Sequence, residues 1–376
     1  MRRKVTVKNF YSKIKEIQTK KKKSIARIAK KGISETMKQK KIIITGYGTV
    51  GKEFIELLYR KKEVYIKQYQ TELIVTGVVG SVGMIYEPQG LDLSILNQLP
   101  TGSIGISQYA SMKDLVLESP VIQGDILVEC TPTNLETGEP ALSYIKKALE
   151  AKMDIVSISK GALVHSLPEL LAIAKGKGCH IKYSGATAAA LPTLDIGEFS
   201  LAGSTIQSIK GILNGTSNFI LTSMSEGNLT FEKALQLAQE NGIAEKNPDL
   251  DIKGLDSACK ILLLANGLLH TNLTLEDVDI DGIDKITKAD IQRAKINSCE
   301  WKLIATAKKQ RDKFILQVKP EMIPPENPLI HVKGTNKGIL FETEEMGAIC
   351  CVGGASHPRG AAAAAMKDMI NLIRQE

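Results

Sequence analysis

The sequence predicts an α/β protein whose first part is a doubly wound parallel sheet and whose second part is another α/β domain. Segments rich in β-branched and apolar residues at 41–45, 73–79, 125–129 and 154–159 alternate with segments of helical spacing, which is typical of βαβ units. The first of these strands runs into a glycine turn that opens a helix, which favours a Rossmann-type sheet.

Length and composition are those of a globular protein with two domains. The chain has 376 residues, of which 43% are apolar. No apolar run approaches the roughly 18–20 residues that a membrane helix needs, and the start does not resemble a secretory signal. The six cysteines form no C-x-x-C pair and lie mostly among apolar neighbours, which indicates reduced thiols in a cytoplasmic protein.

The formal net charge of +8 is concentrated at the start of the chain. Residues 1–41 contain the lysine run 20–23 and only two acidic residues, Glu16 and Glu35, whereas the rest is somewhat acidic. We predict a basic extension over residues 1–40 without a catalytic role. A tail that binds anions or RNA and an organelle-targeting segment are the alternatives. For the folded body, neither a membrane nor a nucleic acid is expected as a partner.

The turn after the first strand has the G-x-G-x-x-G spacing of a dinucleotide-binding loop. One glycine permits the tight turn, the next lets the backbone approach a pyrophosphate, and the third lets helix and strand pack closely. The alternative is a glycine turn that binds nothing. The predicted cofactor contacts in this turn are Gly46, Tyr47, Gly48, Thr49, Val50 and Gly51.

The residues after the second strand bear on the choice of nicotinamide cofactor. Positions 80–83 read Gly-Ser-Val-Gly, so no acidic residue is available for the ribose 2′-hydroxyl of NAD and no arginine for the 2′-phosphate of NADP. The cofactor is therefore predicted to be NADP or NAD, with NADP slightly favoured.

Two later strands deliver polar residues to the same edge of the sheet. The strand at 125–129 leads into Thr131 and Pro132, and the strand at 154–159 leads into Ser159 and Lys160. Because ligands of such sheets bind at the carboxyl ends of the strands, we expect these four residues beside the cofactor. A surface lysine that merely ends a strand is the alternative for Lys160.

Lys260 lies in residues 254–265, where nearly every neighbour after position 257 is apolar, so a largely buried helix is expected. A buried ammonium needs a partner or loses its proton, and Asp256, four residues earlier, lies on the same helical face. The pair of Asp256 and Lys260 is therefore a candidate catalytic pair. A lysine that extends from the helix edge into solvent is the alternative.

Carboxylates crowd the irregular stretch before this helix, which Pro248 and Gly254 interrupt. Glu245, Asp249 and Asp251 lie there. A loop that leads into a buried lysine can carry such groups inward to bind a cationic part of a substrate. This stretch is the first candidate for a substrate site.

Five segments together resemble one family, homoserine dehydrogenase. The resemblance extends from residue 41 to about residue 372, and it is to the short form that lacks a regulatory domain. The segments that carry it are 46–51, 129–134, 157–161, 211–224 and 244–260.

The resemblance implies that the chain interconverts homoserine and aspartate semialdehyde with NAD(P), in threonine and methionine biosynthesis. It implies that Lys160 and Lys260 flank the reacting carbonyl with Asp256 beside them. We expect burial and a like-charged neighbour to lower the pKa of the lysine that supplies the proton. The resemblance also implies a substrate-binding set of Glu245, Asp251, Gly215 and Thr216, and a cofactor contact at Gly353.

The resemblance also implies a homodimer and a division into domains. The expected division is a basic extension at 1–40, a nucleotide-binding domain at 41–165 that residues 335–376 complete, and a substrate-binding and dimerisation domain at 166–334. Gly185 stands where many members have a glutamate that helps to bind a sodium ion, so such an ion is doubtful, and no other metal is predicted.

Two other functions are alternatives on the sequence. One is a related dehydrogenase that acts on another hydroxy amino acid, since Glu245 indicates an amino group but does not fix the chain length. The other is a catalytically weak binding protein whose basic arm contacts RNA. The presence of both lysines together with Asp256 argues against the second alternative.

Overall fold

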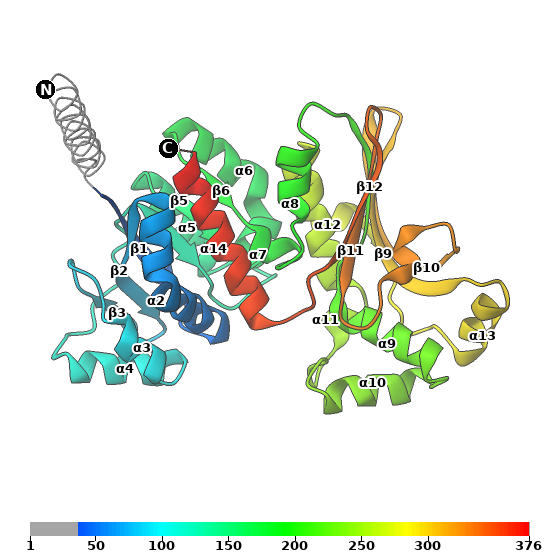
Figure 1. The fold of residues 1–376 in the computed structure, drawn as a ribbon, viewed down its shortest axis with the longest axis horizontal. Helices are drawn as coiled ribbons and strands as arrows, with labels where there is room; N and C mark the ends of the chain where they lie inside the picture. Colours follow the sequence, from blue (N-terminus) through cyan, green and yellow to red (C-terminus); the bar gives the residue numbers. More distant parts are fainter. Residues whose placement is uncertain (1–36, 376) are drawn as a thin grey trace, which may run out of the picture.

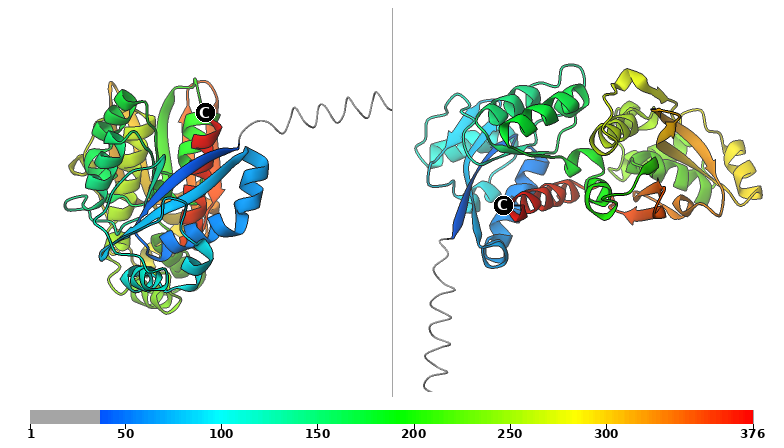
Figure 2. Two further views of the ribbon diagram at one scale, coloured as in Figure 1. Left: turned by 90° about the vertical axis from the view of Figure 1, so that its left-hand side faces the viewer. Right: turned by 90° about the horizontal axis from the view of Figure 1, so that it is seen from above.

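The computed structural model describes residues 37–375, which form two lobes side by side along the long axis (Figures 1 and 2). Each lobe contains one six-stranded sheet. The predicted basic extension lies outside the described residues except for its last four positions, and the first strand begins at Lys38 rather than at residue 41.

The first sheet has the order β3-β2-β1-β4-β5-β6. All neighbouring strands are parallel except the β2–β3 hairpin. The predicted doubly wound sheet is confirmed. Its lobe contains β1 (Lys38–Thr45), α2 (Thr49–Tyr69), β2 (Thr71–Gly80), β3 (Gly83–Tyr86), α3 (Leu93–Gln98), α4 (Gly102–Met112), β4 (Ile126–Glu129), α5 (Ala141–Glu150), β5 (Asp154–Ser157), α6 (Gly161–Lys177) and β6 (Ile181–Lys182).

Three consecutive isoleucines in β1 show why both faces of this sheet are covered. Ile42 and Ile44 pack into a cluster with α2, whereas Ile43 packs on the opposite face with α5 and α6. All three are fully buried. A strand whose side chains are apolar on both faces is typical of a parallel sheet between two layers of helices.

The second sheet has the order β12-β11-β7-β9-β10-β8 and is antiparallel except where β10 meets β8. Helices α9 and α12 pack against it. The remaining elements are α7 (Ser184–Thr187), α8 (Thr193–Asp195), the π-helix η1 (Ile196–Ser200), β7 (Ile206–Ile212), α9 (Gly215–Glu226), α10 (Phe231–Glu240), α11 (Asp249–Ile252), α12 (Leu255–Leu268), η2 (Leu275–Asp277), β8 (Val278–Ile280), α13 (Lys288–Ile296), β9 (Glu300–Gln310), β10 (Lys313–Ile323), η3 (Pro328–His331), β11 (Lys337–Thr343), β12 (Gly347–Gly353) and α14 (Pro358–Arg374).

The last helix, α14, returns to the first lobe and packs beside α2 (Figure 1). Its residues Met366 and Met369 belong to the same apolar cluster as Ile42 and Ile44. In contrast, β11 and β12 belong to the second sheet. Within residues 335–375, α14 is therefore the element that contributes to the first lobe. At the other bound, β6 extends the first sheet beyond residue 165.

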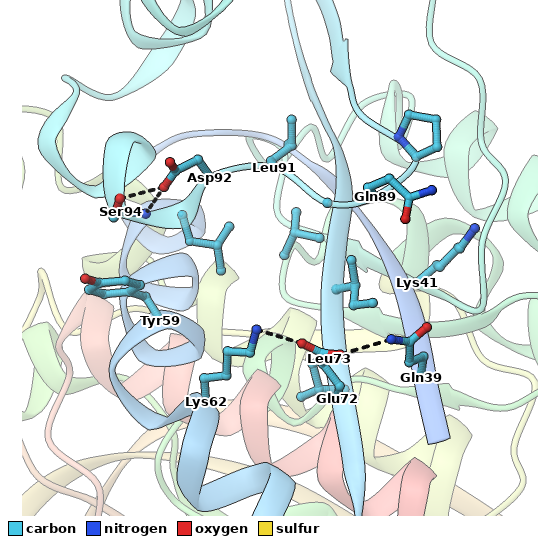
Figure 3. Close-up of a pocket in the computed structure, with 15 residues that line it drawn as sticks. Gln39, Lys41, Tyr59, Lys62, Glu72, Leu73, Gln89, Leu91, Asp92 and Ser94 are labelled. Carbon is cyan, nitrogen blue, oxygen red and sulfur yellow. Dashed lines mark hydrogen bonds and ion pairs between the residues drawn. The ribbon is translucent and has the colours of Figure 1, made fainter. Parts of the chain in front are cut away.

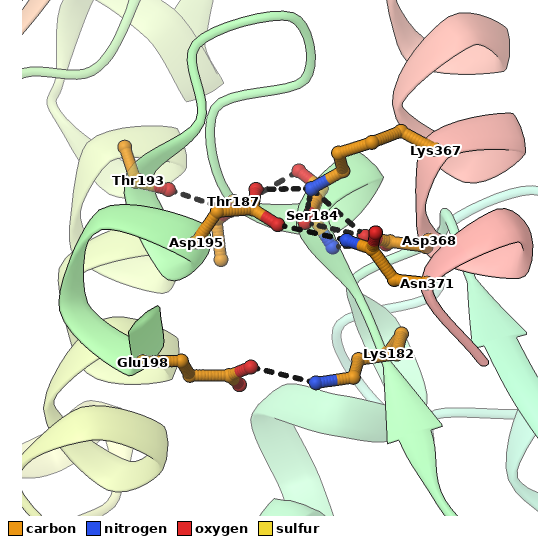
Figure 4. A network of polar contacts seen from close by, with 9 residues as sticks. All are labelled: Lys182, Ser184, Thr187, Thr193, Asp195, Glu198, Lys367, Asp368 and Asn371. Carbon is orange, nitrogen blue, oxygen red and sulfur yellow. Dashed lines mark hydrogen bonds and ion pairs between the residues drawn. The ribbon is translucent and has the colours of Figure 1, made fainter. Parts of the chain in front are cut away.

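A polar network fastens α14 to the connection between the lobes (Figure 4). Asp368, which is 1% exposed, accepts hydrogen bonds from the Ser184 backbone N–H at 2.8 Å and from the Ser184 hydroxyl at 2.7 Å. Lys367 forms an ion pair with Asp195, to which Asn371 also donates at 3.2 Å. These bonds hold α14 against both α7 and α8.

The turn after β1 requires glycine at two positions. Gly46 has φ +94°, and a Cβ there would lie 2.4 Å from the Cys130 carbonyl oxygen. A Cβ at Gly51 would lie 2.4 Å from the Gly46 carbonyl oxygen. The first turn of α2 therefore packs directly on the end of β1 only because Gly51 has no side chain.

We predict that Gly51→Ala lowers the free energy of unfolding by about 1–3 kcal/mol, because the new methyl group has to displace backbone. Chemical denaturation followed by circular dichroism measures this change. Gly176→Ala is the matched control, since a Cβ at Gly176 in α6 meets no atom within 4 Å. It should raise stability by about 0.5–1 kcal/mol. Equal effects of the two substitutions would contradict the packing argument.

Candidate active site

Two lysines share one carboxylate where the lobes meet. Lys160 Nζ lies 3.0 Å from Asp256 Oδ1, and Lys260 Nζ lies 2.5 Å from Asp256 Oδ2. The side chains of Lys160, Lys260 and Asp256 are 24%, 12% and 13% exposed. The structure thus brings together the three residues predicted as the catalytic set, with Lys160 joining the Asp256–Lys260 pair of α12 from a distant part of the sequence.

Local structure explains how these side chains converge. Gly254, with φ +86°, ends the α11 segment and forms the N-cap of α12. Asp256 lies in the first turn of α12, where the helix dipole favours a carboxylate, and Lys260 follows one turn later on the same face. Lys160 is the N-cap of α6, directly after β5, so the parallel sheet delivers it to the carboxyl edge.

Asn214 connects two carboxylates of the site. Its side-chain amide donates to Asp251 Oδ1 at 2.6 Å and to Asp256 Oδ2 at 2.8 Å. Its side-chain oxygen accepts from the Ser217 backbone N–H at 2.8 Å and so caps α9. This one residue therefore fixes the start of α9 relative to α11 and α12.

The charged groups of the cluster shift the pKa of Asp256 and that of Lys160. Burial by itself would raise the pKa of Asp256, but the ammonium groups of Lys260 and Lys160 outweigh it and hold the pKa far below its ordinary value. The same carboxylate raises the pKa of Lys160. The expectation of a lowered lysine pKa is therefore wrong for Lys160, because its nearest charged partner is an anion and not a like charge.

Asp251 has the opposite electrostatic environment. Burial raises its pKa, and the nearby carboxylate of Asp256 raises it further, whereas the hydrogen bond from Asn214 opposes the shift. The charge of Lys260 also opposes the shift, but within residues 37–375 Asp251 forms no ion pair of the kind that Asp256 has with two lysines. A cationic group placed beside Asp251 would therefore stabilise its charged form.

The other predicted substrate residues lie around the start of α9. Gly215 and Thr216 are its first two residues, and the Thr216 hydroxyl donates to the Ile243 carbonyl at 3.1 Å. Glu245 lies two positions after Ile243 in the chain, and its side chain is exposed. A Cβ at Gly215 would lie 2.7 Å from Ser356 Oγ, so the segment after β12 also borders this turn.

A cavity of about 500 Å³ lies at the carboxyl ends of the strands in the first lobe, where the chain connections diverge to either side of β1 and β4. Ligands of such sheets bind at this position. Seven residues of the predicted cofactor set line it, namely Gly46, Tyr47, Gly48, Thr49, Val50, Thr131 and Pro132. Gly51 acts instead through its contact with Gly46.

The start of α2 faces this cavity and suits a pyrophosphate. The N-cap Gly48 makes no side-chain cap, and the first turn has no acidic residue, so backbone N–H groups are available there for an anion. A Cβ at Gly48 would have no neighbour within 4 Å and would project into open space. The residues present therefore fit a dinucleotide.

A buried carboxylate links the cavity to the lysine cluster. Glu129, which is fully buried, accepts from the Thr131 hydroxyl at 2.5 Å and from the Ser159 hydroxyl at 2.6 Å. Lys160 follows Ser159, and its backbone N–H donates to the Thr133 hydroxyl at 3.3 Å. Thr131 and Ser159 are thus held in one network, although only Thr131 lines the cavity.

Gly353 lies apart from this cavity. It is the last residue of β12, has φ +143°, and is not among the lining residues. A second cavity of about 590 Å³, shown in Figure 3, lies near the starts of β1 and β2. Its carboxylates are already engaged, Glu72 with Lys62 at 2.7 Å and Asp92 as the cap of α3. None of the predicted site residues lines it.

Sequence reasoning missed the roles of Asn214 and Glu129. Asn214 directly precedes Gly215 and a segment of helical length, which is a signal for a helix cap but not for contacts to Asp251 and Asp256. Glu129 ends a strand of apolar residues, and a buried acid there indicates a network without naming its partners.

Within residues 37–375, no helix is long and apolar enough to cross a membrane. The same residues contain no group of three His, Cys, Asp or Glu side chains placed to hold a metal ion.

Two family models match nearly all of the folded body. Residues 46–184 match the model "Homoserine dehydrogenase, NAD binding domain", and residues 192–370 match "Homoserine dehydrogenase". The homoserine dehydrogenase of Methanocaldococcus jannaschii is 37% identical over 88% of this chain and 98% of its own length. The NAD(+)-dependent homoserine dehydrogenase of Pseudomonas canavaninivorans is 32% identical over 89% of this chain and 97% of its own length.

Solved structures agree with these matches. The homoserine dehydrogenase of Thiobacillus denitrificans superposes with a TM-score of 0.76 at 25% identity, covering 90% of this chain and 74% of that one. The first lobe is thus an NAD-binding domain. The chain therefore belongs to the homoserine dehydrogenase family, a family of NAD(P)-dependent oxidoreductases that act on a CH–OH group.

Proposed function

We propose that this chain interconverts L-homoserine and L-aspartate semialdehyde at the cluster of Lys160, Lys260 and Asp256. The observation that carries the proposal is that both ammonium groups meet one buried carboxylate beside the NAD-binding cavity. Family membership supports the reaction, and the cluster supports the assignment of the residues.

The geometry suits stabilisation of an alkoxide. A bound reduced nicotinamide supplies the hydride. Lys260 uses two of its three donors on Asp256 and the Leu213 carbonyl, so one donor is available to a substrate oxygen. Lys160 has a raised pKa, so it is charged when the substrate binds. The two ammonium groups stabilise negative charge on the substrate oxygen, and one of them donates the proton that completes the alcohol.

Asp256 positions both lysines rather than acting as a base. Its strongly lowered pKa makes it a poor proton acceptor. We assign the substrate's ammonium to Asp251 and Glu245, because Asp251 is a half-buried carboxylate that forms no ion pair within residues 37–375 and whose charge Lys260 only partly compensates. Gly215 and Thr216 then border the substrate from the start of α9.

For the cofactor we propose NADP as the slightly better ligand. The cavity is lined at the end of β2 by Gly80 and Ser81 and has no carboxylate there to repel a 2′-phosphate. The Ser81 hydroxyl is hydrogen-bonded to the Ser103 hydroxyl at 2.7 Å at the start of α4, so two hydroxyl groups and a helix N-terminus meet at this position. The NAD(+)-dependent Pseudomonas relative shows that the family also includes the other preference.

We propose a homodimer formed through the second lobe. The edge strand β12 pairs only with β11 within residues 37–375, and its side chains are mostly exposed, including Ile349 and Val352. An apolar edge strand of this kind is a template for association. A solution mass equal to one 40.9 kDa chain would count against the dimer.

We also propose the division into a nucleotide-binding and a substrate-binding domain, with α14 returning to the first. The six cysteines, all without a disulfide, fit a reducing cytoplasmic location.

The reaction is tested by offering homoserine with NADP or NAD to the purified protein and following absorbance of the reduced nicotinamide. We expect saturable reduction of both cofactors, with a higher kcat/KM for NADP. Turnover of another hydroxy amino acid in place of homoserine would overturn the proposed substrate. A higher kcat/KM for NAD would overturn only the cofactor preference.

We predict that Lys260→Ala lowers kcat by about three orders of magnitude or more, because it removes a donor to the reacting oxygen. Binding of the reduced cofactor NADPH, measured by its fluorescence, should be nearly unchanged. Lys253→Ala is the control, since Lys253 is an exposed lysine paired with Asp249 at 2.8 Å. A Lys260→Ala protein with near-normal kcat would refute the assigned role.

We predict that Gly48→Val abolishes cofactor binding but leaves the fold intact. Gly48 has φ −78°, which a side chain tolerates, and its Cβ direction is open, so only a ligand would meet the new side chain. Calorimetric titration with NADP measures binding, and circular dichroism checks the fold. Unaltered affinity would show that the glycine turn is not the cofactor site.

A further inference from the structure

Lys337 is a buried lysine that has no assigned role in the reaction. It is the first residue of β11 and is 3% exposed. Its ammonium donates one hydrogen bond, to the Ala188 carbonyl at 3.3 Å, and it forms no ion pair with any carboxylate within residues 37–375. Two of its three donors are therefore available for another acceptor.

The contrast with Lys302 shows that this lack of an anionic partner is unusual. Lys302 is also fully buried, but its ammonium lies 3.2 Å from Glu300 and donates to the Val332 carbonyl at 2.6 Å. A buried ammonium without a carboxylate costs several kcal/mol unless a partner arrives or the proton leaves. Lys337 lacks a carboxylate partner within residues 37–375, whereas Lys302 has Glu300.

Strand register places Lys337 beside the reaction cluster. On β7 the neighbour of Gly338 is Ile212, so Lys337 lies next to Leu213, whose carbonyl accepts from Lys260. On its other side Lys337 pairs with Gly353 of β12, and the segment after β12 reaches the start of α9, where a Cβ at Gly215 would lie 2.7 Å from Ser356 Oγ.

The charged groups that act on Lys337 are those of the cluster. Burial lowers its pKa to about 7, the positive charges of Lys260 and Lys160 contribute to the lowering, and Asp256 opposes it. The site therefore holds this lysine near its point of titration until an anion compensates its charge.

The proposed substrate carries an anionic group that the site has yet to pair. Homoserine carries an ammonium, a hydroxyl and a carboxylate. The proposed function assigns the ammonium to Asp251 and Glu245 and the hydroxyl to Lys160 and Lys260, which share the single negative charge of Asp256. The remaining substrate group is an anion, and the remaining protein group is a cation without an anionic partner.

We infer that Lys337 binds the α-carboxylate of the substrate and so makes the enzyme specific for amino acids over amino alcohols. The inference rests on the proposed function. The ammonium of Lys337 forms an ion pair with the carboxylate and takes up a proton from solvent when it was neutral before binding.

Paired inhibitors test the contact. L-α-aminobutyrate is homoserine without its hydroxyl, and propylamine lacks the carboxylate as well. The ratio of their inhibition constants against homoserine isolates the carboxylate and does not depend on the fraction of folded enzyme. In Lys337→Gln, which keeps a donor for Ala188, we expect the preference for aminobutyrate to fall about 10- to 100-fold, and the KM for homoserine to rise more than kcat falls.

Lys337→Met gives the same comparison if the glutamine variant does not fold. Lys210→Gln is the matched control, because Lys210 lies on β7, is 29% exposed and already faces Glu342 at 3.9 Å. It should leave the ratio unchanged. An unchanged ratio in the Lys337 variants would overturn the inference while leaving the proposed reaction intact. Lack of homoserine turnover by the unaltered protein would instead refute the proposed function.

Discussion

The arrangement of the two lobes depends on the balance of charge around the Asp256 carboxylate. Taking a carboxylate and two ammonium groups out of water is costly, and their mutual attraction offsets that cost only at short distance. The partners come from separate elements, since Lys160 begins α6, Lys260 lies on α12 and Asn214 caps α9. A shift of any of these elements would leave a buried charge without a partner, so the cluster determines how the lobes meet.

The doubly wound sheet supplies the other half of this arrangement. Parallel strands end at one edge, so the turn after β1, the loop after β4 and the segment after β5 are neighbours although they are far apart in sequence. Glu129 then joins the last two through Thr131 and Ser159. One buried carboxylate thus aligns the nucleotide cavity with Lys160, and Asp256 aligns Lys160 with the second lobe.

The features of the site that depend on short spacings in the sequence could be predicted. The contacts between distant segments could not, because they exist only in the folded chain. The glycine turn at 46–51 and the Asp256–Lys260 pair depend on short spacings that determine geometry directly. Lys160 could be placed at a strand end, but the direction of its pKa depends on Asp256, almost one hundred residues away in the chain. The contacts of Asn214 and the burial of Lys337 likewise arise only when strands and helices from different parts of the chain assemble.

The return of α14 to the first lobe has a consequence for biosynthesis. Ile42 and Ile44 of β1 are translated early, yet Met366 and Met369, which cover the same face, are among the last residues to be made. During synthesis on the ribosome, one apolar face of the nucleotide-binding sheet therefore stays incompletely covered until the chain is nearly complete. Domains usually fold as soon as they emerge. In this protein, the domain that begins first finishes last, so chain termination before residue 358 would leave an aggregation-prone surface.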